Sequence, residues 1–309
     1  MKWQGRQGSQ NIEDRRGQSS SRGGGGFFPK GGGRRPSGKQ GGMGVVGILL
    51  MLFVAYQCGI DPSAMLGGNS GIGANSGTNS PIQETTAGDN PSDQLGQFVS
   101  VVLKETEDVW SQVFPREYNM QYPKPRLVLF SDRTSSGCGA ASAQTGPFYC
   151  PADQKVYIDL SFYDQLRTRF RAGGDFAMAY VIAHEVGHHI QRQLGYIDIV
   201  NRVRQTRSQT EANQANVRLE LQADYLAGVW AHYTDRYTGI LEEGDIDEAL
   251  TAAAAIGDDN IQRQTQGYVV EESFTHGSSE QRVRYFREGY RTGDASKSTL
   301  DQFFQAREL

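Results

Sequence analysis

The stretch that decides the fold is Val181–Leu194, which reads VIAHEVGHHIQRQL. It places three histidines and a glutamate inside an apolar, helix-like run that begins with FAMAYVIA. His184 and His188 are four residues apart, so on a helix they share one face and lie one turn from each other. Two imidazoles in this relation can reach one tetrahedral metal ion. The alternative is a pair of core histidines that neighbouring side chains satisfy.

Glu185 follows His184 directly and is displaced by about 100° around the helix. Its carboxylate would lie beside an open position on the metal, where it can take a proton from a bound water. A buried glutamate without such a role would be costly. This is the HExxH pattern, written HEVGH here, and it predicts a Zn²⁺ site with Glu185 as general base. His189 neighbours a ligand, points elsewhere and is expected to be structural.

The third ligand has to come from a later helix. The metzincin pattern HExxHxxGxxH is excluded, because Gln191 and Leu194 stand where it needs glycine and histidine. Glu220 and Asp224 lie one turn apart in the apolar stretch LELQADYLAGVWAH. Such a pair is typical of a metal ligand and a partner that accepts the N–H of a ligating imidazole. We favour Glu220 as ligand and Asp224 as partner; the reverse assignment and a solvated helix face are the alternatives.

The surrounding pattern predicts an α+β domain that is mainly helical and has a small β-sheet. An amphipathic helix is expected to end before Pro115, and a long helix covers residues 209–233. Two short β-like runs, Arg126–Phe130 and Lys155–Leu160, supply the sheet. An extended substrate is expected to pair with the second run as an edge strand.

The cysteines bear on the cellular compartment. Cys138 and Cys150 lie twelve residues apart across a loop rich in glycine, serine and alanine. In an exported domain this spacing predicts a disulfide, although two free thiols are the alternative. Cys58 is expected to stay unpaired.

The N-terminal part has a different composition. Residues 1–42 carry nine Lys and Arg against two acidic residues, with two glycine runs and little apolar content, so we expect a disordered tail. Few aromatic residues interrupt its charges, and no nucleic-acid partner is expected. Residues 61–92 are expected to be a flexible linker, which leaves residues 93–309 as one folded domain.

Residues 43–60, MGVVGILLMLFVAYQCGI, lie in an uncharged run of 21 residues. At about 1.5 Å per residue a helix of this length can cross roughly 30 Å of hydrocarbon. The basic residues before it predict a single-pass transmembrane helix with a cytoplasmic N-terminus and an exported domain. A cleaved signal peptide is the alternative, but the leader is long and no A-x-A site follows.

Several blocks carry a resemblance to a known family, namely MKWQGRQGSQNIEDRRG, HEVGHHIQ, ELQADYLAGVWA and SFTHGSSEQRVRYF. Together they resemble the bacterial predicted neutral zinc metallopeptidases over nearly the whole chain. The chain is more distantly similar to membrane zinc proteases of the heat-shock and CAAX-prenyl types. Those pair HExxH with a later ExxxD and a T-H-P…R block. Thr275, His276 and Arg282 match that block, whereas Gly277 replaces its proline.

The resemblance implies a zincin-like metallopeptidase domain after one transmembrane helix, in a bacterial inner membrane with the domain in the periplasm. It implies a zinc endopeptidase acting on proteins or peptides, with zinc bound by His184, His188 and Glu220. His276 would steady the oxyanion, and Arg282 would orient Asp224 or a neighbouring carboxylate. A histidine bonded to backbone and a solvated arginine are the alternatives.

A different class of function also fits these residues. The chain could bind zinc without hydrolysis and act as an envelope scaffold for protein partners. Only a peptidase needs Glu185, whereas a scaffold needs only the metal ligands.

Overall fold

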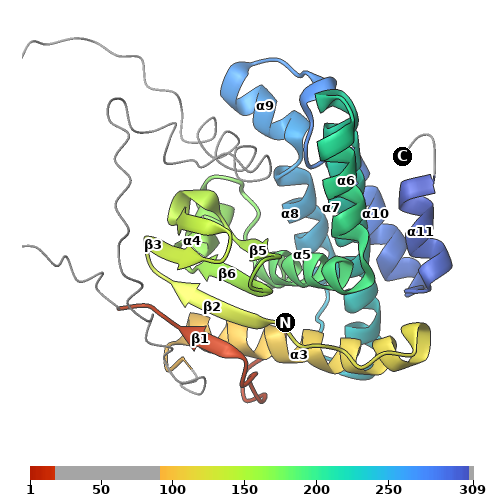
Figure 1. The fold of residues 1–309 in the computed structure, drawn as a ribbon. Coiled ribbons are helices and arrows are strands. Elements are labelled where there is room, and N and C mark those ends of the chain that lie inside the picture. The colour runs from red at the N-terminus through yellow and green to blue at the C-terminus, as the bar shows by residue number, and fades with distance from the viewer. Residues whose placement is uncertain (18–90, 306–309) are drawn as a thin grey trace, which may run out of the picture.

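The computed structural model describes residues 1–17 and 91–305, and these form a mainly helical α+β fold with a small sheet, as predicted (Figure 1). The four-stranded sheet has the order β1-β2-β6-β5. Its first three strands run parallel, and β5 runs antiparallel to β6 at the edge. The strands are β1 (Ile12–Asp14), β2 (Arg126–Phe130), β5 (Phe148–Cys150) and β6 (Lys155–Asp159), and β3 (Arg133–Ser136) pairs with β4 (Gly139–Ser142) in a separate hairpin.

The sheet is buried on both faces, as the alternation along β2 shows. Leu127 and Leu129 belong to the main core beneath the helices. Val128 and Phe130 point to the opposite face and join a smaller apolar cluster with Tyr157. This period of two is the ordinary geometry of a strand. The smaller cluster explains why a short hairpin can pack on the outer face.

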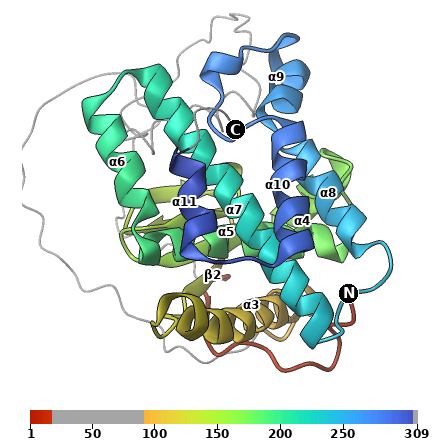
Figure 2. The same ribbon diagram turned by 90° about the vertical axis from the view of Figure 1, so that its right-hand side faces the viewer.

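The helix that carries HEVGH, α5 (Asp175–Leu194), lies between the sheet and a layer of further helices (Figure 2). It ends at Gly195, whose φ of 86° is the left-handed conformation that glycine adopts readily. The other helices are α3 (Gln94–Tyr118), α4 (Ser161–Thr168), α6 (Tyr196–Thr206), α7 (Gln209–Tyr237), α8 (Asp245–Ala255), α9 (Asp258–Gln266), α10 (Ser279–Thr292) and α11 (Lys297–Gln305).

Two close helix crossings hold α7 against α5 and α10 against α7. A Cβ on Gly187 of α5 would lie 3.1 Å from the carbonyl oxygen of Ala223 in α7. A Cβ on Gly228 of α7, or on Gly289 of α10, would lie 2.0 Å from a backbone oxygen of the facing helix. A side chain at Gly228 or Gly289 would push α7 and α10 apart, and one at Gly187 would require a small shift of the Ala223 backbone. The glycines therefore set how closely α7 approaches the helix of the HEVGH motif and how closely α10 approaches α7.

The expected end of the first helix before Pro115 is wrong, because α3 continues to Tyr118 with Pro115 inside it. The ring of Pro115 removes one hydrogen bond to the carbonyl of Ser111, which lies on the exposed side. Phe114 is fully buried and packs edge-on against Tyr118 at 5.0 Å between ring centroids. This tertiary packing outweighs the local preference of proline to end a helix.

The expected disorder of residues 1–42 is wrong for the first 17 of them. Ile12 is 3% exposed, and its strand β1 pairs with β2. Trp3 packs edge-on against Phe98 of α3, with 5.5 Å between ring centroids. A basic, glycine-rich composition indicates little hydrophobic burial on average, but a few well-placed apolar residues suffice when an existing sheet edge accepts them.

Polar contacts also tie this N-terminal segment to the domain. Glu107 of α3 is 2% exposed in its side chain and accepts hydrogen bonds from the Ser9 hydroxyl and, at 2.8 Å, from the Asn11 amide. Glu105 pairs with Arg6 at 3.0 Å. The N-terminal ammonium of Met1 lies 2.9 Å from Asp175 at the start of α5. These contacts show that residues 1–17 belong to the folded domain, which the sequence predicted to consist of residues 93–309 alone.

Residues 1–17 and 91–305 contain no helix that is long and apolar enough to cross a membrane. The expected span at residues 43–60, and the linker up to residue 90, lie outside the described residues. A single crossing at residues 43–60 would place residues 1–17 and the domain on opposite membrane faces. The pairing of β1 with β2 requires them on the same side, so the expected topology is not compatible with this packing.

Replacing Ser9 with alanine tests the packing of the N-terminal segment. The change leaves the buried Glu107 short of one donor, and we expect the free energy of unfolding to fall by about 1–3 kcal/mol. Denaturant unfolding followed by tryptophan fluorescence measures it. Gln7→Ala, at an exposed position of the same segment, should stay within about 0.5 kcal/mol of wild type. Equal stabilities of the two variants would show that the segment does not pack as described.

Candidate metal centre

Helix α5 presents His184 and His188 side by side, and α7 brings Glu220 up to both. The His184 Nε2 atom lies 3.2 Å from Glu220 Oε2, and His188 Nε2 lies 3.6 Å from Glu220 Oε1. One ligand atom from each residue fits within 4.8 Å of the other two. The structure thus brings together the three residues that the sequence indicated as metal ligands.

This group fits a zinc ion by its chemistry and by one unsatisfied atom. Two imidazole nitrogens and one carboxylate oxygen are a common ligand set of catalytic zinc. Glu220 is 2% exposed, and within the described part of the chain its Oε1 atom has no hydrogen-bond partner. An orphaned oxygen at this depth is costly unless something binds it. A metal ion held by the three residues would satisfy it.

Asp224 lies behind His184 and fixes the orientation of its ring. Its Oδ1 is 2.8 Å from His184 Nδ1 and accepts the Tyr180 hydroxyl at 2.6 Å. Arg282 donates to Oδ2 at 2.8 Å and to Oδ1 at 3.0 Å. With its oxygens occupied in this way, Asp224 holds the Nδ1 side of the ring and turns Nε2 toward Glu220.

Asp224 and Arg282 form a buried ion pair in this network, so the charge of each is offset by the other. Burial alone would raise the pKa of Asp224, but the Arg282 guanidinium and His184 lower it to about 2. Arg282 is 2% exposed, so it is a buried partner of Asp224 and not a solvated helix charge. Tyr180, which the sequence analysis missed, lies one helical turn before His184 on the same face, and that spacing is the signal that could have found it.

His188 is oriented by a glutamine that the sequence analysis also missed. Its Nδ1 lies 2.8 Å from Gln191 Oε1, and the Gln191 amide donates to the Leu219 carbonyl at 2.6 Å. Because the amide nitrogen is engaged there, the Gln191 oxygen accepts the His188 N–H. Gln191 lies three residues after His188, which places both on one face of α5. Both imidazoles thus have Nδ1 held and Nε2 directed at the metal position.

Glu185 lines the same cavity as the three ligand residues and is 8% exposed. Burial raises its pKa, and this effect outweighs the opposing influence of His188 and His184. A carboxylate whose pKa moves toward neutrality can both accept and return a proton at ordinary pH. The arrangement suits a general base beside the metal position.

His276 lines the same cavity, and Asp258 at the start of α9 holds it there. One Asp258 oxygen lies 3.0 Å from His276 Nδ1, and the other accepts the backbone N–H groups of Thr275 and His276, each at 2.6 Å. Burial alone would lower the pKa of His276, but the Asp258 carboxylate raises it. Asp258 was not singled out from the sequence. Its signal, an aspartate in the first turn of a later helix, is too common to be specific.

The loop that carries His276 differs from the T-H-P block in its turn. Gly277 has a φ of 93°, a left-handed conformation that proline, with φ near −65°, cannot adopt. A Cβ at this position would also approach Leu221 to 3.0 Å. The replacement of proline by glycine therefore accompanies a different local backbone.

The strand expected to form the sheet edge, Lys155–Leu160, is the interior strand β6, because β2 and β5 pair with its two sides. The edge strand beside the cavity is β5, which was not recognised in the sequence, and its Tyr149 lines the cavity. The Tyr149 hydroxyl lies 3.1 Å from His189 Nδ1, and His189 Nε2–H donates to the Pro123 carbonyl. Burial lowers the pKa of His189 to about 4. This neutral histidine anchors β5 to α5.

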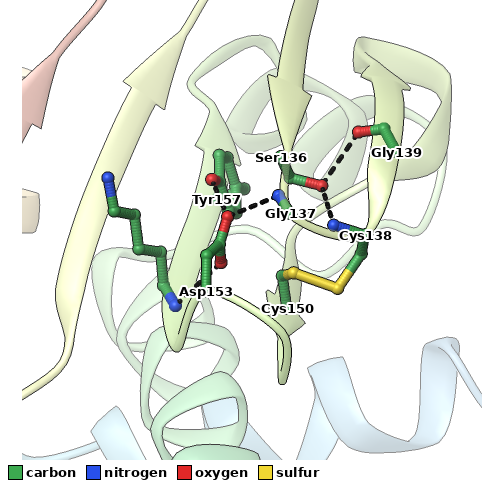
Figure 3. The surroundings of a disulfide bond; sticks show 8 residues. Ser136, Gly137, Cys138, Gly139, Cys150, Asp153 and Tyr157 are labelled. Atoms are coloured by element: carbon green, nitrogen blue, oxygen red, sulfur yellow. Dashed lines mark hydrogen bonds between the residues drawn. A yellow bond between two sulfur atoms is a disulfide. The ribbon is translucent and has the colours of Figure 1, made fainter. Parts of the chain in front are cut away.

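The disulfide between Cys138 and Cys150 closes a loop that ends in β5 (Figure 3). Asp153 supports the same loop by accepting hydrogen bonds from the Gly137 N–H at 2.6 Å and the Tyr157 hydroxyl at 2.7 Å. Residues 145–149 of the closed loop line the cavity. The disulfide therefore restrains one wall of the candidate site.

Comparison with known proteins agrees with this geometry. The family model described as "Putative neutral zinc metallopeptidase" matches residues 1–301. "Uncharacterized protein YpfJ" of Escherichia coli strain K12 is 46% identical over 300 residues, which cover 96% of this chain and 97% of that protein. "Uncharacterized protein Rv2575" of Mycobacterium tuberculosis strain H37Rv is 45% identical over 196 residues, or 60% of this chain and 64% of that protein.

No solved structure matches the chain. The family match begins at residue 1, so it includes the N-terminal segment that packs against α3 and β2. The HEVGH helix, Glu220 and the loop of His276 all fall within the matched residues. On the extent of this match and the identity to its relatives, the chain belongs to the "Putative neutral zinc metallopeptidase" family.

Proposed function

We propose that the protein is a zinc-dependent metallopeptidase that hydrolyses peptide bonds in protein or peptide substrates. The observation that carries the proposal is the buried group of two histidines and Glu220. Each histidine has its Nδ1 held from behind by Asp224 or Gln191, and among the described residues one Glu220 oxygen has no hydrogen-bond partner. Family membership supports the same reading.

His184, His188 and Glu220 would hold the zinc ion, which when bound supplies a Lewis acid for the attacking water and the peptide carbonyl. Glu185, which lines the cavity beside the metal position, removes a proton from the water and later returns it to the departing amine. His276, held by Asp258, donates a hydrogen bond where negative charge develops on the carbonyl oxygen.

Strand β5 is the surface that an extended substrate would use. It lies at the edge of the sheet beside the cavity, and an edge strand offers unpaired backbone groups to an added strand. The disulfide and the contact between Tyr149 and His189 restrain β5 before any substrate arrives. Binding of a substrate strand would then cost little conformational entropy in β5, because β5 is already ordered.

Replacing Glu185 with glutamine in the full chain tests the proposed base. The amide keeps the shape of the side chain but cannot accept the proton, so we expect cleavage of unfolded casein to fall about 10²- to 10⁴-fold. Zinc content should remain at one per chain, because the three ligands are unchanged.

Three other results would each contradict a different part of the proposal. Equal cleavage by wild type and Glu185→Gln would show that another group acts as base. One zinc in both proteins with cleavage in neither would favour a non-hydrolytic scaffold. Absence of zinc from both would reject the metal centre.

Replacing Asp258 with asparagine tests the proposed role of His276. The neutral amide weakens the orientation and the charge of the imidazole, and we expect kcat for casein to fall about 10- to 100-fold with zinc content unchanged. The matched control is Asp247→Asn, an exposed aspartate in the first turn of α8. If the two variants cleave casein equally fast, His276 does not act through Asp258.

We further propose that residues 1–17 and 91–305 share one extracytoplasmic compartment. Disulfides persist in oxidising environments, which favours an exported position for the loop of Cys138 and Cys150. The pairing of β1 with β2 then supports the same compartment for the N-terminal segment. Attachment to a bacterial inner membrane through residues 43–60 stays a prediction from the sequence, and the proposed arrangement requires that both ends of this segment lie on one face of the membrane.

Single cysteines at two exposed positions, Gln7→Cys and Thr210→Cys, test this arrangement with a membrane-impermeant maleimide added to intact spheroplasts. We expect equal labelling at both positions above the level of the wild-type chain. Labelling at residue 210 alone would contradict the shared compartment and support the predicted topology with a cytoplasmic N-terminus. Labelling at neither position until lysis would reject the extracytoplasmic location.

A further inference from the structure

The cavity beside the metal centre has room for more than the attacking water. Its volume is about 260 Å³, whereas a single water needs roughly 10–15 Å³. The lining includes all three ligand residues, Glu185 and His276. The remaining space therefore adjoins the reacting atoms, where the residues that flank a scissile bond would lie.

Much of the remaining lining is apolar and comes from several elements. We define the apolar wall as Phe162 of α4, Phe170 in the segment before α5, Val181 of α5, Ile256 at the end of α8 and Ile261 of α9. Val181 lies one helical turn before His184, so it faces the cavity from the same side as the ligands. The wall is thus adjacent to the metal centre.

The wall offers little to a charged substrate side chain. Among the described residues that line the cavity, the charged ones belong to the metal centre and its network, apart from Arg204 of α6. Arg204 donates to the side-chain oxygens of Asn201 and Asn216. A charged side chain against the apolar wall would lose its water without gaining a partner, whereas an apolar side chain gains from the same transfer.

We propose that the apolar wall makes this site selective for peptides with a bulky apolar residue, such as leucine or phenylalanine, next to the scissile bond. The inference rests on the proposed peptidase function and names its substrate class. Phe162 and Phe170 are the specificity-determining residues, because both are only half-buried and can still be covered by a ligand.

The test uses binding, so that it does not depend on hydrolysis. The full-length Glu185→Gln chain, loaded with zinc, is titrated with fluorescent peptides that differ only in carrying leucine or aspartate at the central position. We expect the leucine peptide to bind at least about 10-fold more tightly. Phe162→Ala and Phe170→Ala, each made in the same Glu185→Gln chain, should reduce that ratio by about 10-fold. Tyr237→Ala, at an exposed position on α7 outside the cavity lining, should leave it unchanged.

The outcomes separate the inference from the peptidase proposal. Equal binding of the two peptides, tighter binding of the aspartate peptide, or a preference that both phenylalanine variants retain would each overturn the apolar selectivity. Zinc content and thermal unfolding of the variants show whether a lost preference reflects lost folding; in that case Phe162→Leu, which keeps an apolar side chain, must retain the preference. Casein cleavage by the wild-type chain decides the peptidase proposal separately.

Discussion

The buried carboxylate of Asp224 is the interaction on which the metal centre depends. An isolated charge at this depth would be strongly unfavourable, so it has to be paired and hydrogen-bonded. Arg282 from α10 supplies the charge, and Tyr180 and His184 from α5 supply further contacts. One side chain thereby fixes three helices relative to each other. The same contacts turn His184 so that its second nitrogen meets Glu220.

Backbone geometry makes that pairing possible. Gly228 and Gly289 let α7 and α10 approach until their backbones touch, and Gly187 does the same for α5 against α7. At this separation the Arg282 side chain lies 2.8 Å from Asp224 Oδ2. Buried carboxylates are paired in the N-terminal segment as well. Glu105 and Glu107 of α3 are buried and bind partners from residues 6–11. Pairing of buried charge thus connects parts of the chain that are remote in sequence.

The relations within one helix could be predicted well. The spacing of His184, Glu185 and His188 follows from the period of a helix, and the apolar setting of Glu220 singled it out among the acidic residues. Tyr180 and Gln191 obey the same period, yet they were missed because tyrosine and glutamine on a helix face seldom mark a metal site. Asp258 could not be found in this way, because it lies 18 residues before His276, at the other end of a segment that includes α9, and only the fold brings the two side chains together.

The sequence by itself determined the helix of the metal motif, the candidate ligand types and the cysteine pair, because each depends on residues close together along the chain. Only the tertiary structure decided which strand forms the sheet edge, since strand order depends on pairing between distant segments. It also decided that residues 1–17 belong to the folded domain. The composition of a segment is an average over its residues. Folding depends on individual contacts, such as the pairing of Ile12 with β2 and the hydrogen bond from Ser9 to the buried Glu107.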